Sequence, residues 1–157
     1  MLMRLILKAL LPIVYNITLQ RVLYLTAFIT FGIGDGITSA YMMEVQGPFS
    51  ESNPLIRDLF MTMGFEGMVL TKIWVTFMML LATYMVQVRS KENIYWTING
   101  FLIAQIAAGV SGIYANMSAL AGSVHPEASD IVLLYFILVL ILTGTGSFID
   151  KHVAYKA

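Results

Sequence analysis

Four apolar stretches, each about twenty residues long, constrain this chain more than any other feature. They cover residues 22–43, 67–88, 94–115 and 130–149. An α-helix of about 20 apolar residues is long enough to cross the hydrocarbon core of a bilayer. Together the stretches leave no room for a soluble domain in a chain of 157 residues. The sequence therefore predicts a single all-α integral membrane domain, residues 1–157, with four transmembrane helices.

Composition agrees with a location in the cell membrane. Hydrophobic residues make up 59% of the chain and charged residues 11%, against about 25% charged residues in a typical globular protein. Nine basic and nine acidic residues give a net charge of zero, so the charge gives no indication of nucleic-acid binding. Cysteine is absent, which excludes disulfides, thiolate metal sites, iron–sulfur clusters and thioether-linked haem. We expect the lipid bilayer as a partner and no cofactor.

The distribution of charge predicts the orientation of the helices. Basic residues gather at both ends of the chain and in the connection between the second and third spans: Arg4, Lys8, Arg21, Arg89, Lys91, Lys151 and Lys156. Acidic residues gather in the other two connections: Glu44, Glu51, Asp58, Glu66, Glu127 and Asp130. Cytoplasmic connections carry the excess of Lys and Arg. Both termini are thus predicted to be cytoplasmic, with connections 44–66 and 116–129 facing outward.

Residues 1–20 are predicted to form a helix on the membrane surface. Polar or helix-breaking residues recur there at every fourth place: Arg4, Lys8, Pro12, Asn16 and Gln20. One polar row along an otherwise apolar helix is typical of an interfacial amphipathic helix. A secretory signal peptide is the alternative, although the apolar run is interrupted and no small-residue cleavage pattern follows.

The outer connection between the first two spans predicts a short amphipathic helix. Asn53 is suited to the N-cap, Pro54 to the first helical position, and Gly64 to the stop about three turns later. The apolar residues between them fall on one face: Leu55, Ile56, Leu59, Phe60 and Met63. In an alternative arrangement, this segment folds Glu51 and Asn53 back over the mouth of the membrane domain.

Two charged residues lie within the apolar spans, Asp35 in the first and Lys72 near the start of the second. A charge in the bilayer core costs at least a few kcal/mol, so such residues usually pair. The connection between the two spans places both at similar depth, and we therefore expect an intramembrane ion pair. Ser39 lies one turn after Asp35, on the row that turns towards the interior of the bundle.

Small residues predict where helices approach closely. Such residues recur at every fourth place in the first and third spans: Gly32, Gly36 and Ala40, and Gly100, Ala104, Ala108 and Gly112. Ridges of this kind let backbones touch, so we expect these two helices to pack on each other or on a partner. The third span also carries Asn99, Gln105 and Asn116. The fourth, apolar on all sides over 131–142, is predicted to face lipid or a partner.

The segments 35–39 (Asp-Gly-Ile-Thr-Ser) and 51–54 (Glu-Ser-Asn-Pro), with Gly64 and Lys72 after them, resemble a family of small prokaryotic four-helix membrane proteins of unknown function. The resemblance covers about the first half of the chain and implies no activity. It implies that four polar residues form one constellation: Asp35, Glu51, Asn53 and Lys72. The structural interpretation is a polar clamp that holds helix register, and the functional one is a solute or proton site.

Residues 32–35, Gly-Ile-Gly-Asp, resemble the Gly-x-Gly-Asp signature of intramembrane aspartyl proteases such as presenilin and the prepilin peptidases. That chemistry needs two carboxylates that share a proton. No second aspartate lies in the interior of a predicted span, since Asp130 is the first residue of the fourth. We therefore predict that the protein is not an enzyme.

Methionines suggest a weak metal site. Met61 and Met63 have a spacing that suits Cu(I), a soft ion that takes thioether ligands, and three more methionines lie on the same predicted side: Met42, Met43 and Met68. The alternative is that methionine fills irregular apolar gaps. His125 and His152 fall on opposite predicted sides of the membrane and cannot share an ion.

Two functions remain. In a transporter or pore, Thr38, Ser39 and Gln105 would join Asp35 and Lys72 along a polar path, although no inverted repeat is visible. We favour a non-catalytic accessory subunit of a larger membrane complex, because the chain has little mass outside the membrane, no catalytic set and an apolar fourth helix. A copper-dependent ammonia or methane monooxygenase is one candidate complex.

Overall fold

The computed structural model describes residues 18–152, and within them it is helical with no strand. Its elements are α2 (Leu19–Ala27), η1 (Phe28–Gly34), α3 (Asp35–Gln46), η2 (Pro48–Ser50), α4 (Pro54–Arg89), α5 (Tyr95–Leu120) and α6 (Ala128–His152). Four continuous helical segments are long and apolar enough to cross a membrane: Leu19–Gln46, Pro54–Arg89, Tyr95–Leu120 and Ala128–His152. The all-helical, four-span prediction is confirmed to this extent. The predicted interfacial helix, residues 1–20, lies outside the described residues except for its last three, where Thr18 is the N-cap of α2 and Leu19 and Gln20 begin it.

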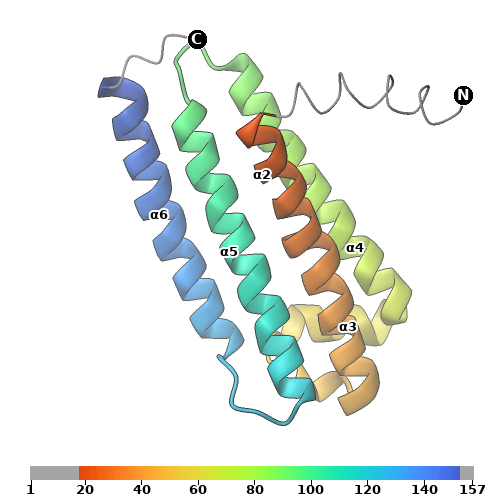
Figure 1. The fold of residues 1–157 in the computed structure, drawn as a ribbon. Coiled ribbons are helices and arrows are strands. Elements are labelled where there is room, and N and C mark those ends of the chain that lie inside the picture. Colours follow the sequence, from red (N-terminus) through yellow and green to blue (C-terminus); the bar gives the residue numbers. More distant parts are fainter. Residues whose placement is uncertain (1–17, 153–157) are drawn as a thin grey trace, which may run out of the picture.

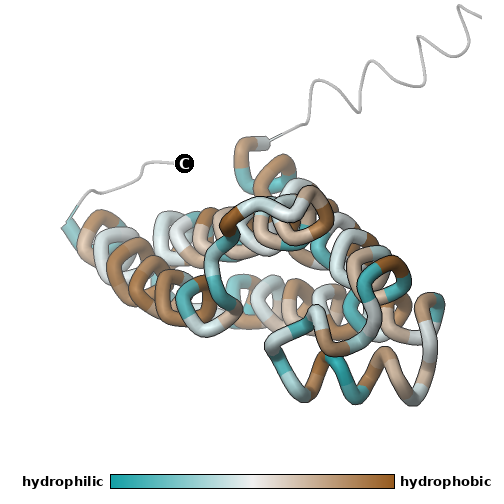
Figure 2. The backbone as a smooth tube through the Cα atoms, turned by 90° about the horizontal axis from the view of Figure 1, so that it is seen from below, coloured by the Kyte–Doolittle hydropathy of each residue, from teal (hydrophilic) through white to brown (hydrophobic). Residues whose placement is uncertain are grey.

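The helices form a row in which α5 is central (Figure 1). On one side α5 packs against α6, and on the other against the helix composed of α2, η1 and α3. α4 packs against the η1 and α3 parts of that composite helix. Among the described elements, α6 has extensive contact with α5 alone. Figure 2 shows that α6 is hydrophobic along most of its length, which agrees with the expected outer position of the fourth helix.

The first spanning helix changes its winding just before Asp35. The seven residues of η1 form a π-helix, and the backbone N–H of Asp35 accordingly bonds to the carbonyl of Thr30, five residues earlier. A π-helical turn contains more residues than an α-helical turn, so it rotates every side chain that follows. π-helical segments are rare and often lie at functional sites. η1 therefore helps to decide which way Asp35 points.

Glycines make the close helix contacts, but not in the expected pairs. A Cβ on Gly32 would lie 3.2 Å from Thr76 Cβ, and one on Gly36 would lie 3.4 Å from Lys72 Cβ. Both neighbours belong to α4, so the ridge of the first helix faces the second spanning helix. The expected contact between the first and third helices is also present. A Cβ on Gly109 would lie 2.5 Å from the Phe31 nitrogen, and Gly112 of the predicted ridge lies against the Asp35 side chain.

The third-helix ridge faces α6 at its start. A Cβ on Gly100 would collide with the Leu142 carbonyl, and one on Gly146 with the Trp96 carbonyl. Asp150 strengthens this junction. Its carboxylate accepts hydrogen bonds from the Trp96 and Thr97 amides, both at 2.9 Å, and from the Thr97 hydroxyl at 2.8 Å. The end of α6 thus caps the start of α5.

The predicted short outer helix is present as the first part of α4. Asn53 Oδ1 accepts the Leu55 amide at 3.0 Å, and Pro54 occupies the first turn. Gly64 then interrupts the helix with a φ of +67°, a conformation that glycine adopts without steric cost. The chain continues beyond Gly64 into the spanning part of α4. In Figure 1 the short arm lies across the end of the bundle where α3 ends.

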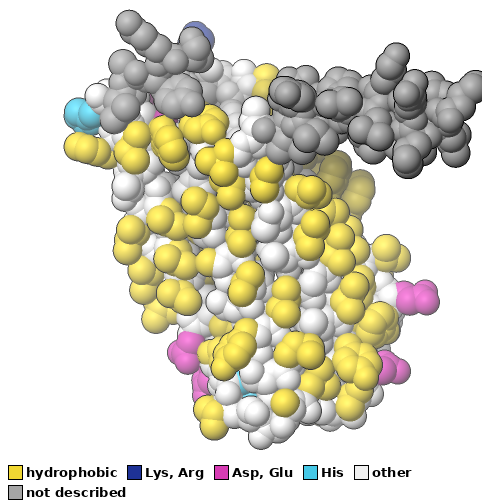
Figure 3. All heavy atoms as spheres, viewed as in Figure 1, with side chains coloured by type: hydrophobic (Ala, Val, Ile, Leu, Met, Phe, Trp, Pro, Cys, Tyr) yellow, Lys and Arg dark blue, Asp and Glu magenta, His cyan; other side chains and the backbone are white. Residues whose placement is uncertain are grey.

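Charge separates along the bundle. α2 begins, and α6 ends, at the end that also holds the α4–α5 connection (Figure 1). The described basic residues near this end are Arg21, Arg89, Lys91 and Lys151. On the face drawn in Figure 3, hydrophobic side chains cover the middle, and acidic side chains lie towards the opposite end. We call that opposite end, which carries the α5–α6 connection, the acidic end.

Candidate functional site

A cavity of about 400 Å³ lies towards the acidic end, between the helices. Its volume is within the range of about 300–1,000 Å³ that is usual for small-molecule sites. Residues of α3, α4, α5 and α6 line it, together with 50–53 before α4 and 125–126 before α6. The polar side chains in its wall include Asp35, Glu51, Asn53, Lys72 and Asn116. The cavity thus collects polar groups from four different parts of the chain.

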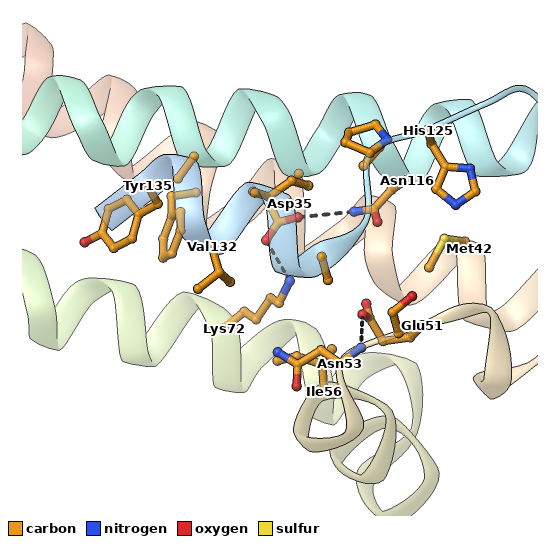
Figure 4. Close-up of a pocket in the computed structure, with 18 of the residues that line it drawn as sticks. Asp35, Met42, Glu51, Asn53, Ile56, Lys72, Asn116, His125, Val132 and Tyr135 are labelled. Carbon is orange, nitrogen blue, oxygen red and sulfur yellow. Dashed lines mark hydrogen bonds and ion pairs between the residues drawn. The ribbon is translucent and has the colours of Figure 1, made fainter. Parts of the chain in front are cut away.

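Asp35 and Lys72 form the centre of the cavity wall (Figure 4). Lys72 Nζ donates to Asp35 Oδ2 at 2.7 Å, and Asn116 Nδ2 donates to Asp35 Oδ1 at 3.2 Å. Each carboxylate oxygen therefore has a donor. The exposed fractions of the side chains are 17% for Lys72 and 18% for Asp35. The pair is partly open to the cavity.

A glycine makes room for this pair. A Cβ on Gly112 would collide with the Asp35 carboxylate, whereas a Cβ on Gly36 would only come into ordinary contact with the Lys72 side chain. Gly112 lies one turn before Asn116 on α5, so the same face of α5 both accommodates and holds the carboxylate. The small-residue pattern of the third helix is therefore used here to admit a side chain.

Asn116 connects the carboxylate to the backbone of the first helix. Besides Asp35, its Nδ2 donates to Thr38 Oγ1 at 3.1 Å. The Thr38 hydroxyl in turn donates to the Gly34 carbonyl at 2.9 Å. The exposed fraction of Asn116 is 8%. Sequence reasoning noted Asn116 as a polar group of the third span without assigning it to the site; its position one turn after Gly112 is the signal that was available.

Glu51 is nearly buried, with an exposed fraction of 9%. Its Oε2 accepts a hydrogen bond from the Ser39 hydroxyl at 3.1 Å, and its Oε1 accepts one from the Asn53 backbone N–H at 2.8 Å. No basic side chain of residues 18–152 lies within salt-bridge distance of it. Arg57, on the neighbouring arm, stacks over the Phe49 ring at 5.2 Å. Neutral donors alone thus hold the Glu51 carboxylate.

The other side of the cavity is apolar and aromatic. Phe31 and Tyr135 stack with their ring centroids 6.5 Å apart and their planes inclined by 27°, and Phe136 and Val132 extend this wall. The Tyr135 hydroxyl is hydrogen-bonded by Gln105 Nε2. In Figure 4, Tyr135 and Val132 lie on one side of the Asp35–Lys72 pair, whereas Glu51 and His125 lie on the other. The cavity is therefore amphipathic.

The structure brings together most of the polar residues that the sequence singled out. Asp35, Glu51, Asn53 and Lys72 line one cavity, and Ser39 reaches it through Glu51. Gln105 contributes indirectly, through Tyr135.

The methionines, by contrast, do not gather into one site. Met42, Met43 and Met68 are buried in one apolar cluster, while Met61 and Met63 are exposed on the short arm. This arrangement favours packing for the first three. In the described part of the chain, no group of His, Asp or Glu is placed to hold a metal ion.

Fold and site together define a small four-helix protein whose helices are long and apolar enough to cross a membrane, with an amphipathic cavity at one end. The chain belongs to the family described as a domain of unknown function (DUF5658), whose model matches residues 26–121. The match contains Asp35, Glu51, Lys72 and Asn116 and ends before α6. No curated protein and no solved structure shows a significant match.

Proposed function

We propose that this chain is an integral membrane protein that binds a small molecule in the cavity, as a carrier or receptor without catalytic activity. The observation that carries the proposal is the partial exposure of the Asp35–Lys72 pair to a cavity of about 400 Å³. A pair that served only as a register clamp would be better sealed, because solvent weakens an ion pair. The polar groups of the wall instead remain within reach of an occupant.

The membrane orientation is part of the proposal. The described basic residues near one end, Arg21, Arg89, Lys91 and Lys151, support a cytoplasmic location for that end and for both termini. The acidic end, with the cavity, then faces outward. Residues 1–20 would lie on the cytoplasmic leaflet. The Asp35–Lys72 contact would be an intramembrane ion pair, and a small molecule would reach it from the outer side.

We also propose that the constellation of Asp35, Glu51, Asn53 and Lys72 is a property of the family. All four positions lie within the matched residues 26–121. The proposal that the protein is not catalytic rests on the hydrogen-bond partners of the Asp35 carboxylate, which are an ammonium group and a side-chain amide. Such partners support a binding role, whereas an aspartyl protease needs a second carboxylate against the first.

Solvent access tests this function, and a chain without native cysteine suits the experiment. We expect a membrane-impermeant maleimide, added from outside, to label Ala115→Cys, a position that borders the cavity with an exposed fraction of 7%. Ala104→Cys, on the same helix but fully buried, is the matched negative control. Ser123→Cys, in the exposed α5–α6 connection, is the positive control. An Ala115→Cys variant as unreactive as Ala104→Cys would show that the cavity is sealed and would favour the clamp.

A second candidate function is that of an accessory subunit of a larger membrane complex. The observation that favours it is that, among the described elements, α6 packs extensively on α5 alone and leaves Leu133, Leu140 and Ile141 exposed. A partner helix or lipid would cover these side chains. Mass spectrometry of the mildly solubilised native particle should then show companion polypeptides in fixed ratio. A particle that holds this chain alone would contradict the hypothesis, including its copper-monooxygenase form.

A further inference from the structure

The charges in the cavity wall do not balance. Two carboxylates line the cavity, Asp35 and Glu51, against one ammonium group, Lys72. His125 also lines it. Lys72 is committed to Asp35 at 2.7 Å. One negative charge, on Glu51, therefore remains without an ionic partner in the described part of the chain.

Glu51 has capacity for a further donor. Its two hydrogen bonds come from the Ser39 hydroxyl and the Asn53 amide, whereas an ionised carboxylate can accept about four. Removing a carboxylate from water without a compensating positive charge is costly. A cation that entered the cavity beside Glu51 would remove this cost. The site therefore favours a positively charged occupant.

Asn116 adds a second acceptor to the polar side. Its Nδ2 donates to Asp35 and to Thr38, while its Oδ1 accepts no hydrogen bond within residues 18–152. An anionic occupant would meet the Glu51 carboxylate and this carbonyl oxygen. It would also have to separate Lys72 from Asp35 to find a positive partner. The polar groups thus disfavour an anion.

The apolar side of the cavity restricts the occupant further. Phe31, Tyr135 and Phe136 present aromatic rings, beside the aliphatic Ile131 and Val132. A strongly hydrated inorganic ion would gain little from these walls. An organic body attached to the positive group would instead bury its apolar surface there.

We propose that the cavity binds a monovalent organic amine that carries an apolar or aromatic group. Its ammonium head lies at Glu51 and Asn116, and its body extends past the Asp35–Lys72 pair towards Tyr135 (Figure 4). Phe136 lines the same cavity. This inference rests on the proposed function, because it names the class of molecule that the cavity takes. Glu51 is the residue that makes the cavity select a positively charged ligand.

The test compares three probes of similar size that differ in charge: phenylethylamine, phenylethanol and phenylacetate. The Ala115→Cys chain in lipid nanodiscs is labelled with maleimide in the presence of each probe. We expect the amine to protect the cysteine at concentrations about tenfold lower than the other two probes, a difference typical of one charge-assisted contact. The melting temperature of the unmodified chain should rise with the amine only.

Glu51→Gln, made in the Ala115→Cys chain, should abolish the preference for the amine. The matched control is Glu44→Gln, which removes the same charge from an exposed position at the same end of the bundle. This control variant should retain the preference for the amine. If Glu51→Gln does not fold, the comparison of the three probes on the Ala115→Cys chain still decides.

Several results would overturn the inference and leave the proposed function standing. These are equal or better protection by phenylethanol or phenylacetate, protection by sodium chloride at the same concentration, or retention of amine preference in Glu51→Gln. Absence of protection by any probe on a reactive Ala115→Cys chain would overturn it as well. If Ala115→Cys is itself unreactive without probes, the proposed function fails together with the inference.

Discussion

Lys72 Nζ lies 2.7 Å from Asp35 Oδ2, although 37 residues separate the two in the chain. Three structural features produce this contact. The π-helical turn before Asp35 rotates the carboxylate, Gly112 leaves space for it, and Asn116 holds its second oxygen. The pair joins the first and second spanning helices, while Asn116 adds the third. Its stability and its surroundings are therefore open to direct test.

The first prediction concerns energetic coupling across this pair. Asp35→Asn and Lys72→Met should each destabilise the chain by about 2 kcal/mol, because each leaves its partner's charge without compensation in a largely buried position. The double variant should lose much less than the sum. Unfolding in mixed detergent micelles measures all three free energies. Strict additivity would mean that the two charges do not interact.

The second prediction concerns the space beside Asp35. Gly112→Ala should lower the free energy of unfolding by about 1–3 kcal/mol, because the new methyl group would displace the carboxylate. Gly144→Ala on α6 is the matched control. A Cβ at Gly144 meets nothing within 4 Å, so that variant should be neutral or slightly more stable. Equal stability of the two variants would show that the carboxylate moves aside at no cost.

The third prediction concerns the junction of α5 and α6. Asp150→Ala should cost about 1–2 kcal/mol, since it removes the acceptor of the Trp96 and Thr97 amides at the start of α5. Hydrogen exchange should rise first at these two amides. Lys151→Ala, at an exposed neighbouring position, should leave both stability and exchange unchanged. Unaltered exchange at Trp96 and Thr97 in Asp150→Ala would argue against the cap.

The fourth prediction concerns orientation. If the end opposite the acidic end lies in the cytoplasm, Ser123→Cys should react with an impermeant maleimide in intact cells. Glu92→Cys should react only after the membrane is permeabilised. Both residues are exposed, in the α5–α6 and α4–α5 connections respectively. The reverse pattern would place the cavity on the cytoplasmic side.

Much of the architecture could be predicted from local sequence signals. The length of the apolar stretches determined the number of helices that could span a membrane, and Asn53, Pro54 and Gly64 determined the short arm of α4. Such signals act within a few residues of the chain. The cost of a charge among apolar residues also led to the expectation that Asp35 and Lys72 pair, and their side chains do lie together in the structure.

Other features depended on how the helices turn about their own axes. The winding of η1, the contact of Gly109 with Phe31, the hydrogen bonds of Asn116 and the cap provided by Asp150 were not anticipated. The last three are contacts between helices, and η1 sets the rotation of the helix that follows it. A rotation of part of a turn exchanges one neighbour for another.

The sequence by itself thus determined the helices and the polar residues that need partners, because hydrophobic length and desolvation cost are properties of single segments. Only the tertiary structure decided which groups share a cavity and that no basic side chain of residues 18–152 pairs with Glu51. These are properties of distances between segments far apart in the chain.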